Sequence, residues 1–416
     1  MTNNAKIYDS ISQFEPLMPE DAGELEDLGL ELTQRSANLA NELPVATLEG
    51  VRELLRIINS YYSNLIEGHN THPIDVERAM RQDYSKDPAK RDCQIESLIH
   101  IDLQQKIETR LNAESELDVT GSEFFRWLHH EFYEQMPESL RWVDGEGVER
   151  EWVEGGEFRR RFVAVGKHLP PKPESIASFL ERFHAVYDPN KIHGTKKFVA
   201  IAAAHHRLLW IHPFPDGNGR VARLFTDAFF KRINLSGYGL WNVSRGFARR
   251  SSEYKRLLDA ADFHREDDLD GRGNLSNRRL VDFCRFFLKT CIDQTEYMAS
   301  VLRLNNFLPR LEKYVSQRAN GMIVDEFGAA FLPLPPRTAS ILREVALTGE
   351  LPRSRVVEIV GMSEKSGRNV LKALLGEGLL TSVTTWHRSA VRLGFPAHAA
   401  GHWFPNLFPV TEAEME

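Results

Sequence analysis

The amino-acid sequence predicts a mainly α-helical protein with one small β-hairpin and a C-terminal segment that mixes helices and strands. Apolar residues recur at helical spacing through most of the chain, most clearly at 47–66 and 280–302. Short β-branched stretches bounded by glycine or proline occur near 156–170 and 376–393, and such stretches favour strands. With 416 residues the chain is long enough for two or three domains and a sizeable core.

Composition and charge exclude several classes of protein. The charged share of 27% is ordinary for a globular protein, and a net charge of −7 argues against a general polyanion binder. No signal peptide opens the chain and no apolar run is long enough to span a membrane, so we expect no membrane partner. The three cysteines are odd in number and lack metal-type spacing, which favours free thiols and a cytoplasmic location.

The first 115 residues form an expected N-terminal helical segment. Its first fifty residues hold ten acids against two bases, which is typical of a solvated helix face. Apolar spacing predicts helices over 22–41, 47–66 and 74–112, the last interrupted near Pro88.

Residues 116–300 form an expected central core. Phe124, Phe125, Leu128 and Phe132 begin it with a helix over 120–135. A hairpin is expected at about 156–170, because the prolines that follow forbid a helix. The alternative is that this hairpin only connects two helices of the core. Further helices are expected over 174–186, 196–211 and 280–302.

The stretch around which this core is organised is the loop 212–223, His-Pro-Phe-Pro-Asp-Gly-Asn-Gly-Arg-Val-Ala-Arg. It lies between two apolar helices, and the second helix begins inside it. Gly217, Asn218 and Gly219 stand at that helix start, where unpaired backbone N–H groups and the helix dipole favour phosphate. A plain turn would explain the glycines and Asn218, but not the other residues of the loop.

Four charged or titratable side chains complete this loop. Arg220 and Arg223 are three residues apart, so they share a helix face and can hold a polyphosphate. Asp216 is placed to ligate a Mg²⁺ ion that bridges phosphates. His212 is the side chain here that can take up a proton near neutral pH.

With every defining position present, the loop resembles the signature of the Fic (filamentation induced by cAMP) family, His-x-Phe-x-Asp-Gly-Asn-Gly-Arg-x-x-Arg. The resemblance covers about 118–289. It implies a Fic-type helical core that transfers AMP from the substrate ATP, with Mg²⁺, to a Ser, Thr or Tyr hydroxyl of a target protein or of itself. It implies that His212 is the general base, and that the hairpin at 156–170 is a flap that pins the target by strand addition.

A second stretch also resembles a family pattern. Ser63-Asn-Leu-Ile-Glu67-Gly68 fits the Ser/Thr-x-x-x-Glu-Gly/Asn sequence that forms an inhibitory helix in many Fic relatives. The resemblance implies that Glu67 pairs with Arg223 and holds it away from the γ-phosphate of ATP. The alternative is a surface glutamate at a helix end.

Two neighbouring features add no expected site residues. His205 and His206 are adjacent, so they point to different faces of a helix, and structural roles are expected rather than a metal hydrolase site. The segment that borders adenine in related proteins departs here at Gly246, Arg250 and Lys255. No adenine contacts are therefore expected from it.

The C-terminal part divides into a connecting helix with a proline-rich linker (301–335), a segment that resembles a winged helix-turn-helix (336–395) and a C-terminal tail (396–416). Between residues 337 and 392 nine Lys or Arg face five Glu, a net charge of +4 in an acidic protein. Its third expected helix carries the candidate DNA contacts Lys365, Arg368 and Lys372. A dimerisation or docking module is the alternative.

Two further readings of the function stay open. The same motif chemistry serves relatives that remove AMP from the target or transfer another nucleotide-derived group. The chain could instead be a nucleotide-sensing, DNA-binding regulator, although sensing alone needs no base such as His212. A homodimer is compatible with all of these readings.

Overall fold

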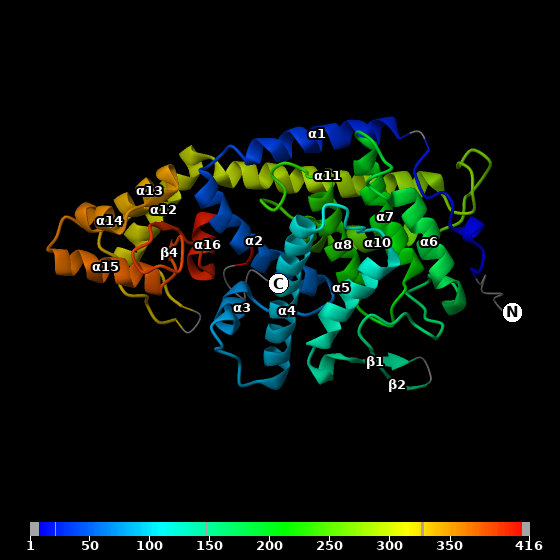
Figure 1. Cartoon of the computed structure of the whole chain (residues 1–416), viewed down its shortest axis with the longest axis horizontal. Helices are drawn as coiled ribbons and strands as arrows, with labels where there is room; N and C mark the ends of the chain where they lie inside the picture. The colour runs from blue at the N-terminus through cyan, green and yellow to red at the C-terminus, as the bar shows by residue number, and fades with distance from the viewer. Residues whose placement is uncertain (1–7, 21, 146–147, 326–327, 410–416) are drawn as a thin grey trace.

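A pair of long helices runs along one side of the molecule. In the computed structural model, which describes residues 8–20, 22–145, 148–325 and 328–409, α1 (Gly23–Leu39) lies along α11 (Asn277–Leu302) (Figure 1). Leu25, Leu32 and Leu39 recur every seven residues and are buried, whereas the acidic residues of α1 face outward. The acidic residues of α1 are therefore solvated, whereas Glu15 precedes this helix and pairs with Arg182 at 2.6 Å.

Helix α8 (Asn218–Arg232), which begins inside the motif loop, lies at the centre of the fold (Figure 1). Its apolar residues Val221, Leu224, Phe225, Ala228 and Phe229 are all buried. Burying one such large side chain contributes about 1.5–3 kcal/mol, so the helix start is held firmly. The helices that pack against it are α2 (Val45–Ile66), α4 (Pro88–Ala113), α5 (Ser122–Glu134) and α7 (Lys196–Ile211).

The remaining helices cover this centre. The helical stretch is interrupted between Met80 and Pro88, as expected, and Pro88 begins α4 at a position where its missing N–H has no cost, with Asp87 as the cap. Across the described ranges, no helix combines the length and the apolar character needed to cross a membrane. The other helices of this part are α3 (Pro73–Met80), α6 (Ile176–Tyr187), α9 (Val243–Arg249), α10 (Ser251–Ala260) and α12 (Leu304–Ala319).

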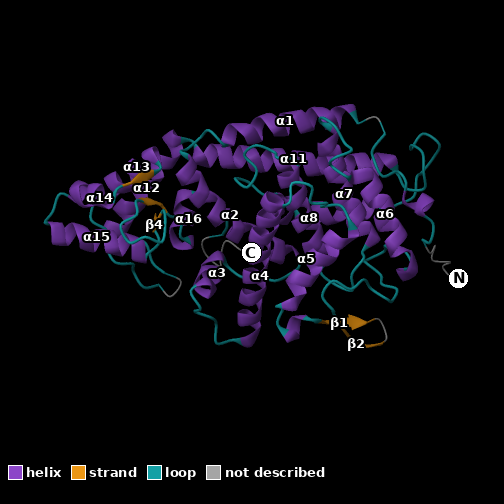
Figure 2. Ribbon diagram, in the orientation of Figure 1, coloured by secondary structure: helices purple, strands orange, loops and turns teal. Residues whose placement is uncertain are grey.

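The hairpin expected at 156–170 is wrong in position. The paired strands are β1 (Trp142–Gly145) and β2 (Val148–Trp152) (Figure 2). The rings of Trp142 and Trp152 pack with their centroids 5.1 Å apart. The segment 156–170 instead holds one isolated bridge, between Val165 and His168. The physical reason is that its backbone pairs with the motif loop: Arg159 N–H donates to the Pro213 carbonyl at 2.9 Å.

Three helices and a small antiparallel sheet form the end of the molecule that carries α13 to α15 (Figures 1 and 2). Ser363 caps the third of these helices, accepting a hydrogen bond from Ser366 N–H at 3.3 Å. The strand order is β3-β5-β4. The elements are α13 (Thr338–Thr348), β3 (Glu350–Leu351), α14 (Arg353–Val360), α15 (Glu364–Gly376), β4 (Leu380–Ser382) and β5 (Val391–Leu393).

Much of the segment expected as a C-terminal tail, 396–416, is folded into the core. It forms α16 (Ala397–Trp403), whose Trp403 is fully buried. Tyr62 O–H and Arg245 donate to the Leu407 carbonyl at 2.9 and 3.1 Å. Residues 410–416 lie outside the described residues.

Candidate active site

Two residues in the left-handed region turn the chain between α7 and α8. His212 ends α7 with φ 48° and ψ 62°, and Gly217 precedes α8 with φ 75°. A Cβ at Gly217 would lie 2.8 Å from the Tyr133 ring, so only glycine fits. The Asn218 side chain accepts from the Phe214 N–H at 3.0 Å and donates to its carbonyl at 2.9 Å. These contacts fix the loop before any ligand binds.

Phe214 packs inward, as its apolar character predicts, and its ring stacks on His129 at 4.0 Å. The imidazole of His129 in turn accepts from the Gly156 N–H at 2.8 Å. The aromatic stack therefore connects the loop to α5 and to the start of the segment 156–170.

His212 has an electrostatic environment that suits a base. Burial, reinforced by the nearby Arg159 guanidinium, lowers the pKa of His212 to about 4. The imidazole is therefore neutral near pH 7 and can accept a proton. Arg159 also donates from Nε to the His212 carbonyl at 2.8 Å, which holds the backbone of this residue in place.

Asp216 is kept ionised next to the helix start. Burial opposes its charge, but Arg220 and the Tyr133 hydroxyl outweigh burial and lower the pKa of Asp216. Its Oδ2 accepts from Tyr133 at 2.5 Å and from Arg220 at 2.8 Å. Its side chain is still 38% exposed, so an ionised oxygen ligand faces the site, and a hard cation such as Mg²⁺ fits this donor.

Arg220 has a buried carboxylate partner that the sequence analysis missed. Glu96 on α4 is fully buried, and its Oε1 accepts from Arg220 at 2.5 Å. The only sequence signal was local: Glu96 is three residues before Ile99, on the apolar face of a predicted helix. A charged residue on an apolar helix face indicates that a buried residue of opposite charge pairs with it, but the sequence does not identify that residue.

Glu67 and Arg223 come together from 156 positions apart in the sequence, with Glu67 Oε1 accepting from Arg223 Nη2 at 2.5 Å. Ser63 contributes twice: its hydroxyl accepts from Arg223 Nε at 2.9 Å and its carbonyl from Nη2 at 3.0 Å. Burial raises the pKa of Glu67, but Arg223 and Arg220 lower it below its ordinary value. Arg223 is therefore held by the two residues that the inhibitory pattern singled out.

The Glu67 carboxylate also covers the first turn of α8. A Cβ at Gly219 would clash with Glu67 Oε1, so the missing side chain of Gly219 makes room for an anionic group. A carboxylate near a helix N-terminus interacts favourably with the helix dipole, as a phosphate would. Glu67 thus stands in the electrostatic environment that the sequence analysis assigned to nucleotide phosphates.

The neighbouring residues that the sequence analysis set aside are bonded within the core. His205 contacts the Thr226 and Tyr254 hydroxyls, each at 2.7 Å, and His206 contacts the Leu258 carbonyl at 3.1 Å. Beside Gly246, the Arg245 side chain donates to Gln294 at 2.8 Å in addition to the C-terminal segment. Structural roles explain these side chains.

Comparison with known proteins shows which family the region around this site resembles. Residues 117–230 match the model of the Fic/DOC family. A protein adenylyltransferase Fic of Drosophila erecta is 42% identical over 80 residues, covering 19% of this chain and 16% of the relative. That of Culex quinquefasciatus is 34% identical over 110 residues, covering 26% and 21%. The chain thus covers about a fifth or less of these relatives.

A solved structure agrees with the helical fold. A Fic domain-containing signaling protein from Bacteroides thetaiotaomicron superimposes with a TM-score of 0.50 at 18% identity, covering 66% of this chain and 96% of that chain. At this identity the likeness concerns the fold alone. The matched region 117–230 contains the whole motif loop and most of α8. The candidate active site thus lies in the part of the chain, residues 117–230, that is similar to the Fic/DOC family.

Proposed function

We propose that the protein transfers AMP from ATP to a Ser, Thr or Tyr hydroxyl of a target protein, and that Glu67 restrains this activity. One observation carries the proposal: Glu67, an anion, pairs with Arg223 over the first turn of α8, where phosphates would bind. A neutral His212 and an ionised Asp216 lie on the same loop, as acyl- or phosphoryl-type transfer to a hydroxyl requires.

In the proposed reaction, Nδ1 or Nε2 of His212 takes the proton from the attacking hydroxyl. The hydroxyl oxygen forms a bond to the α-phosphorus, and the bond between that phosphorus and the pyrophosphate oxygen breaks. The N–H groups of Gly217, Asn218 and Gly219 stabilise the charge that develops on the α-phosphate, and Arg220 and Arg223 hold the outer phosphates. The products are the AMP-modified side chain and pyrophosphate.

Asp216 is the residue that would hold Mg²⁺, because its carboxylate is ionised and partly exposed. When bound, the ion neutralises part of the charge on the phosphates. Tyr133 and Arg220 orient this carboxylate through the bonds to its Oδ2. The chain thus supplies an oriented ligand rather than a mobile one.

The restraint follows from competition for Arg223. While Glu67 and Ser63 occupy its guanidinium, Arg223 does not bind the γ-phosphate, and the Glu67 charge repels that phosphate. Replacing Glu67 would free both the cation and the space above Gly219.

The segment 156–170 is proposed as the surface that receives the target main chain. It lies against the motif loop through Arg159, while Phe162 is 61% exposed and so is available to a partner. An extended target segment would add to its backbone by hydrogen bonds, as in strand addition.

The decisive experiment incubates the Glu67→Gly protein with labelled ATP and cell extract, and identifies the labelled proteins by mass spectrometry. Adenylyl transfer adds one AMP to a Ser, Thr or Tyr, on a target or on the protein itself. Transfer of another nucleotide-derived group gives a different mass, and AMP removal gives loss of an existing adduct. Absence of any adduct in this variant, while it remains folded and binds ATP, would exclude the proposal.

A second proposal concerns residues 336–395, which we propose to be a winged helix-turn-helix that binds duplex DNA. Lys365, Arg368 and Lys372 are exposed on α15, and Trp386 in the β4–β5 connection is 59% exposed, so base or phosphate contacts are accessible. A dimerisation or docking role remains the alternative outcome. We also propose a cytoplasmic location, because the thiols of Cys93, Cys284 and Cys291 are free, as is typical of a reducing compartment.

A further inference from the structure

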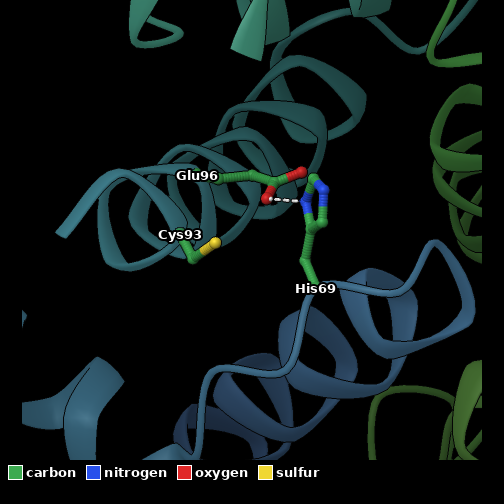
Figure 3. A group of neighbouring side chains, drawn as sticks. All are labelled: His69, Cys93 and Glu96. Atoms are coloured by element: carbon green, nitrogen blue, oxygen red, sulfur yellow. Dashed lines mark hydrogen bonds and ion pairs between the residues drawn. The ribbon is translucent and has the colours of Figure 1, made fainter. Parts of the chain in front are cut away.

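Three side chains with metal-binding atoms meet beside the candidate active site. His69 follows the end of α2, while Cys93 and Glu96 lie one turn apart on α4, and the three side chains point toward one another (Figure 3). Their ligand atoms all lie within 4.8 Å of one another. No local pattern in the sequence indicates this group, because Cys93 lies 24 positions beyond His69.

The carboxylate of this group is already oriented. Glu96 Oε1 is held by Arg220, and its Oε2 lies 2.5 Å from His69 Nδ1. A carboxylate fixed through one oxygen presents the other in a defined direction, which is what outer partners of metal ligands do. Arg220 thus serves here as the outer partner of Glu96.

Cys93 differs from the other two cysteines of the chain. Cys284 and Cys291 are buried, whereas Cys93 is half-buried and open to exchange with solvent. Burial, together with Glu96 and Asp92, raises the pKa of the Cys93 thiol, so its sulfur is protonated at neutral pH. A metal ion would displace this proton and bind the thiolate.

We propose that His69, Cys93 and Glu96 bind a zinc-class transition metal ion. A set of one sulfur, one nitrogen and one oxygen suits Zn²⁺, while the thiolate excludes Mg²⁺ and Ca²⁺ as preferred ions. Water supplies the fourth tetrahedral position. The thiolate and the carboxylate together balance the two positive charges of the ion, and Asp216 at 2.8 Å still accompanies Arg220.

The required movement is small. Tetrahedral zinc places its ligand atoms roughly 3.3–3.8 Å apart, given bonds of about 2.0–2.3 Å. The imidazole of His69 therefore moves about 1 Å away from Glu96, and the Cys93 sulfur moves in by a similar distance. His69 is 31% exposed and follows a helix end, so its side chain has room for this adjustment.

Binding would connect the segment just after Glu67 to α4. His69 is two residues beyond Glu67, so an ion bridging His69 to Cys93 and Glu96 ties the end of α2 to its neighbour. An ion that binds the folded chain and not the unfolded chain raises the free energy of unfolding, by an amount that grows with the logarithm of its concentration above Kd. The thermal midpoint of the full chain should therefore rise with added zinc.

The test is zinc titration of the full, untagged, metal-free chain by calorimetry in a reducing buffer without thiols. We expect one ion per chain, with affinity lowered at least about tenfold in Cys93→Ser and in His69→Ala. The matched control is His193→Ala, which removes an exposed histidine elsewhere. This control should bind zinc as the parent does.

A second readout does not depend on calorimetry. Cobalt(II) bound by Cys93 should give a thiolate-to-metal charge-transfer absorption that is absent in Cys93→Ser, and zinc should slow alkylation of Cys93. Circular dichroism verifies that each variant is folded. Absence of zinc binding in the folded parent, or equal affinity in the parent and both ligand variants, would overturn the proposal.

Discussion

Glu96 holds Arg220 at 2.5 Å, and Glu67 holds Arg223 at the same distance. Each motif arginine is therefore paired with a carboxylate from outside the motif, one on α4 and one at the end of α2. The two pairs differ in exposure: the Glu96 side chain is fully buried, whereas that of Glu67 is 32% exposed and can leave. This difference makes Glu96 a fixed partner and Glu67 a replaceable one.

Glu67→Gly should raise AMP transfer to self or target by at least about tenfold, which corresponds to about 1.4 kcal/mol of barrier. The reason is that Arg223 gains the γ-phosphate as its new partner. Initial rates with labelled ATP measure the effect. Adding Arg223→Ala to this variant should lower activity again; equal rates in the parent and Glu67→Gly would refute the restraint.

His212→Ala, made in the Glu67→Gly background, should abolish transfer while ATP still binds. The base is lost, but the N–H groups at the start of α8 and both arginines remain. Labelling and nucleotide-binding assays on the same preparation separate the two properties. The matched control is His193→Ala, an exposed histidine that should leave labelling unchanged. Undiminished labelling by His212→Ala would remove this residue from the mechanism.

The transfer rate should stay nearly level from pH 8 down to about pH 5.5. The pKa of His212 is lowered to about 4, so the base is neutral above that value and is lost only as the pH falls through it. With an ordinary histidine pKa of about 6.5, the rate would instead fall about tenfold by pH 5.5. Rates of the Glu67→Gly protein, with folding checked at each pH, decide between these profiles.

Glu96→Ala should lower the free energy of unfolding by about 3 kcal/mol, because it breaks a buried ion pair. This value is at the low end of the usual range, since Asp216 still pairs with Arg220 in the variant. The free energy of unfolding is measured by denaturant titration in a chelating buffer, so that no metal contributes. His69→Ala is the matched control, since it removes the other partner of Glu96 but leaves Arg220 paired. Equal losses in both variants would contradict the importance of the Arg220 pair.

Replacing Lys365, Arg368 and Lys372 by Ala in the full chain should weaken duplex DNA binding and flatten its salt dependence. Three lost phosphate contacts lower the slope of log K against log salt by about 2.7. A fluorescence titration at several salt concentrations measures it. The control replaces the exposed Lys86, Lys90 and Arg91, which lie away from α15. If the parent protein shows no affinity for DNA at low salt, the DNA-binding proposal is rejected and residues 336–395 are instead a docking module.

Residues 336–395 should be tested within the full chain, because they pack against the N-terminal helices. Arg392 on β5 pairs with Glu53 on α2 at 2.7 Å, and Phe395 packs where a Cβ at Gly50 would lie. Cutting at residue 336 would expose this apolar contact.

The sequence by itself determined the features that are local. The motif 212–223 brings the candidate site residues together within twelve adjacent positions. The helices follow from apolar spacing, and the bounds expected for 196–211 agree with those of α7. The pattern at Ser63–Gly68 likewise lies within one helix end, so it can be identified from the sequence alone.

Only the tertiary structure decided which distant groups meet. Glu96 is an ordinary helix residue in the sequence, and nothing local links it to Arg220, 124 positions away. The segment 156–170 has strand-like composition, yet its Arg159 N–H bonds to the motif loop, while β1 and β2 are the strands that pair. Hydrophobic periodicity in the sequence indicates which face of a helix or strand is buried. Packing between the elements decides which residues meet on that face, and a buried charge there is stable only when it is paired with an opposite charge.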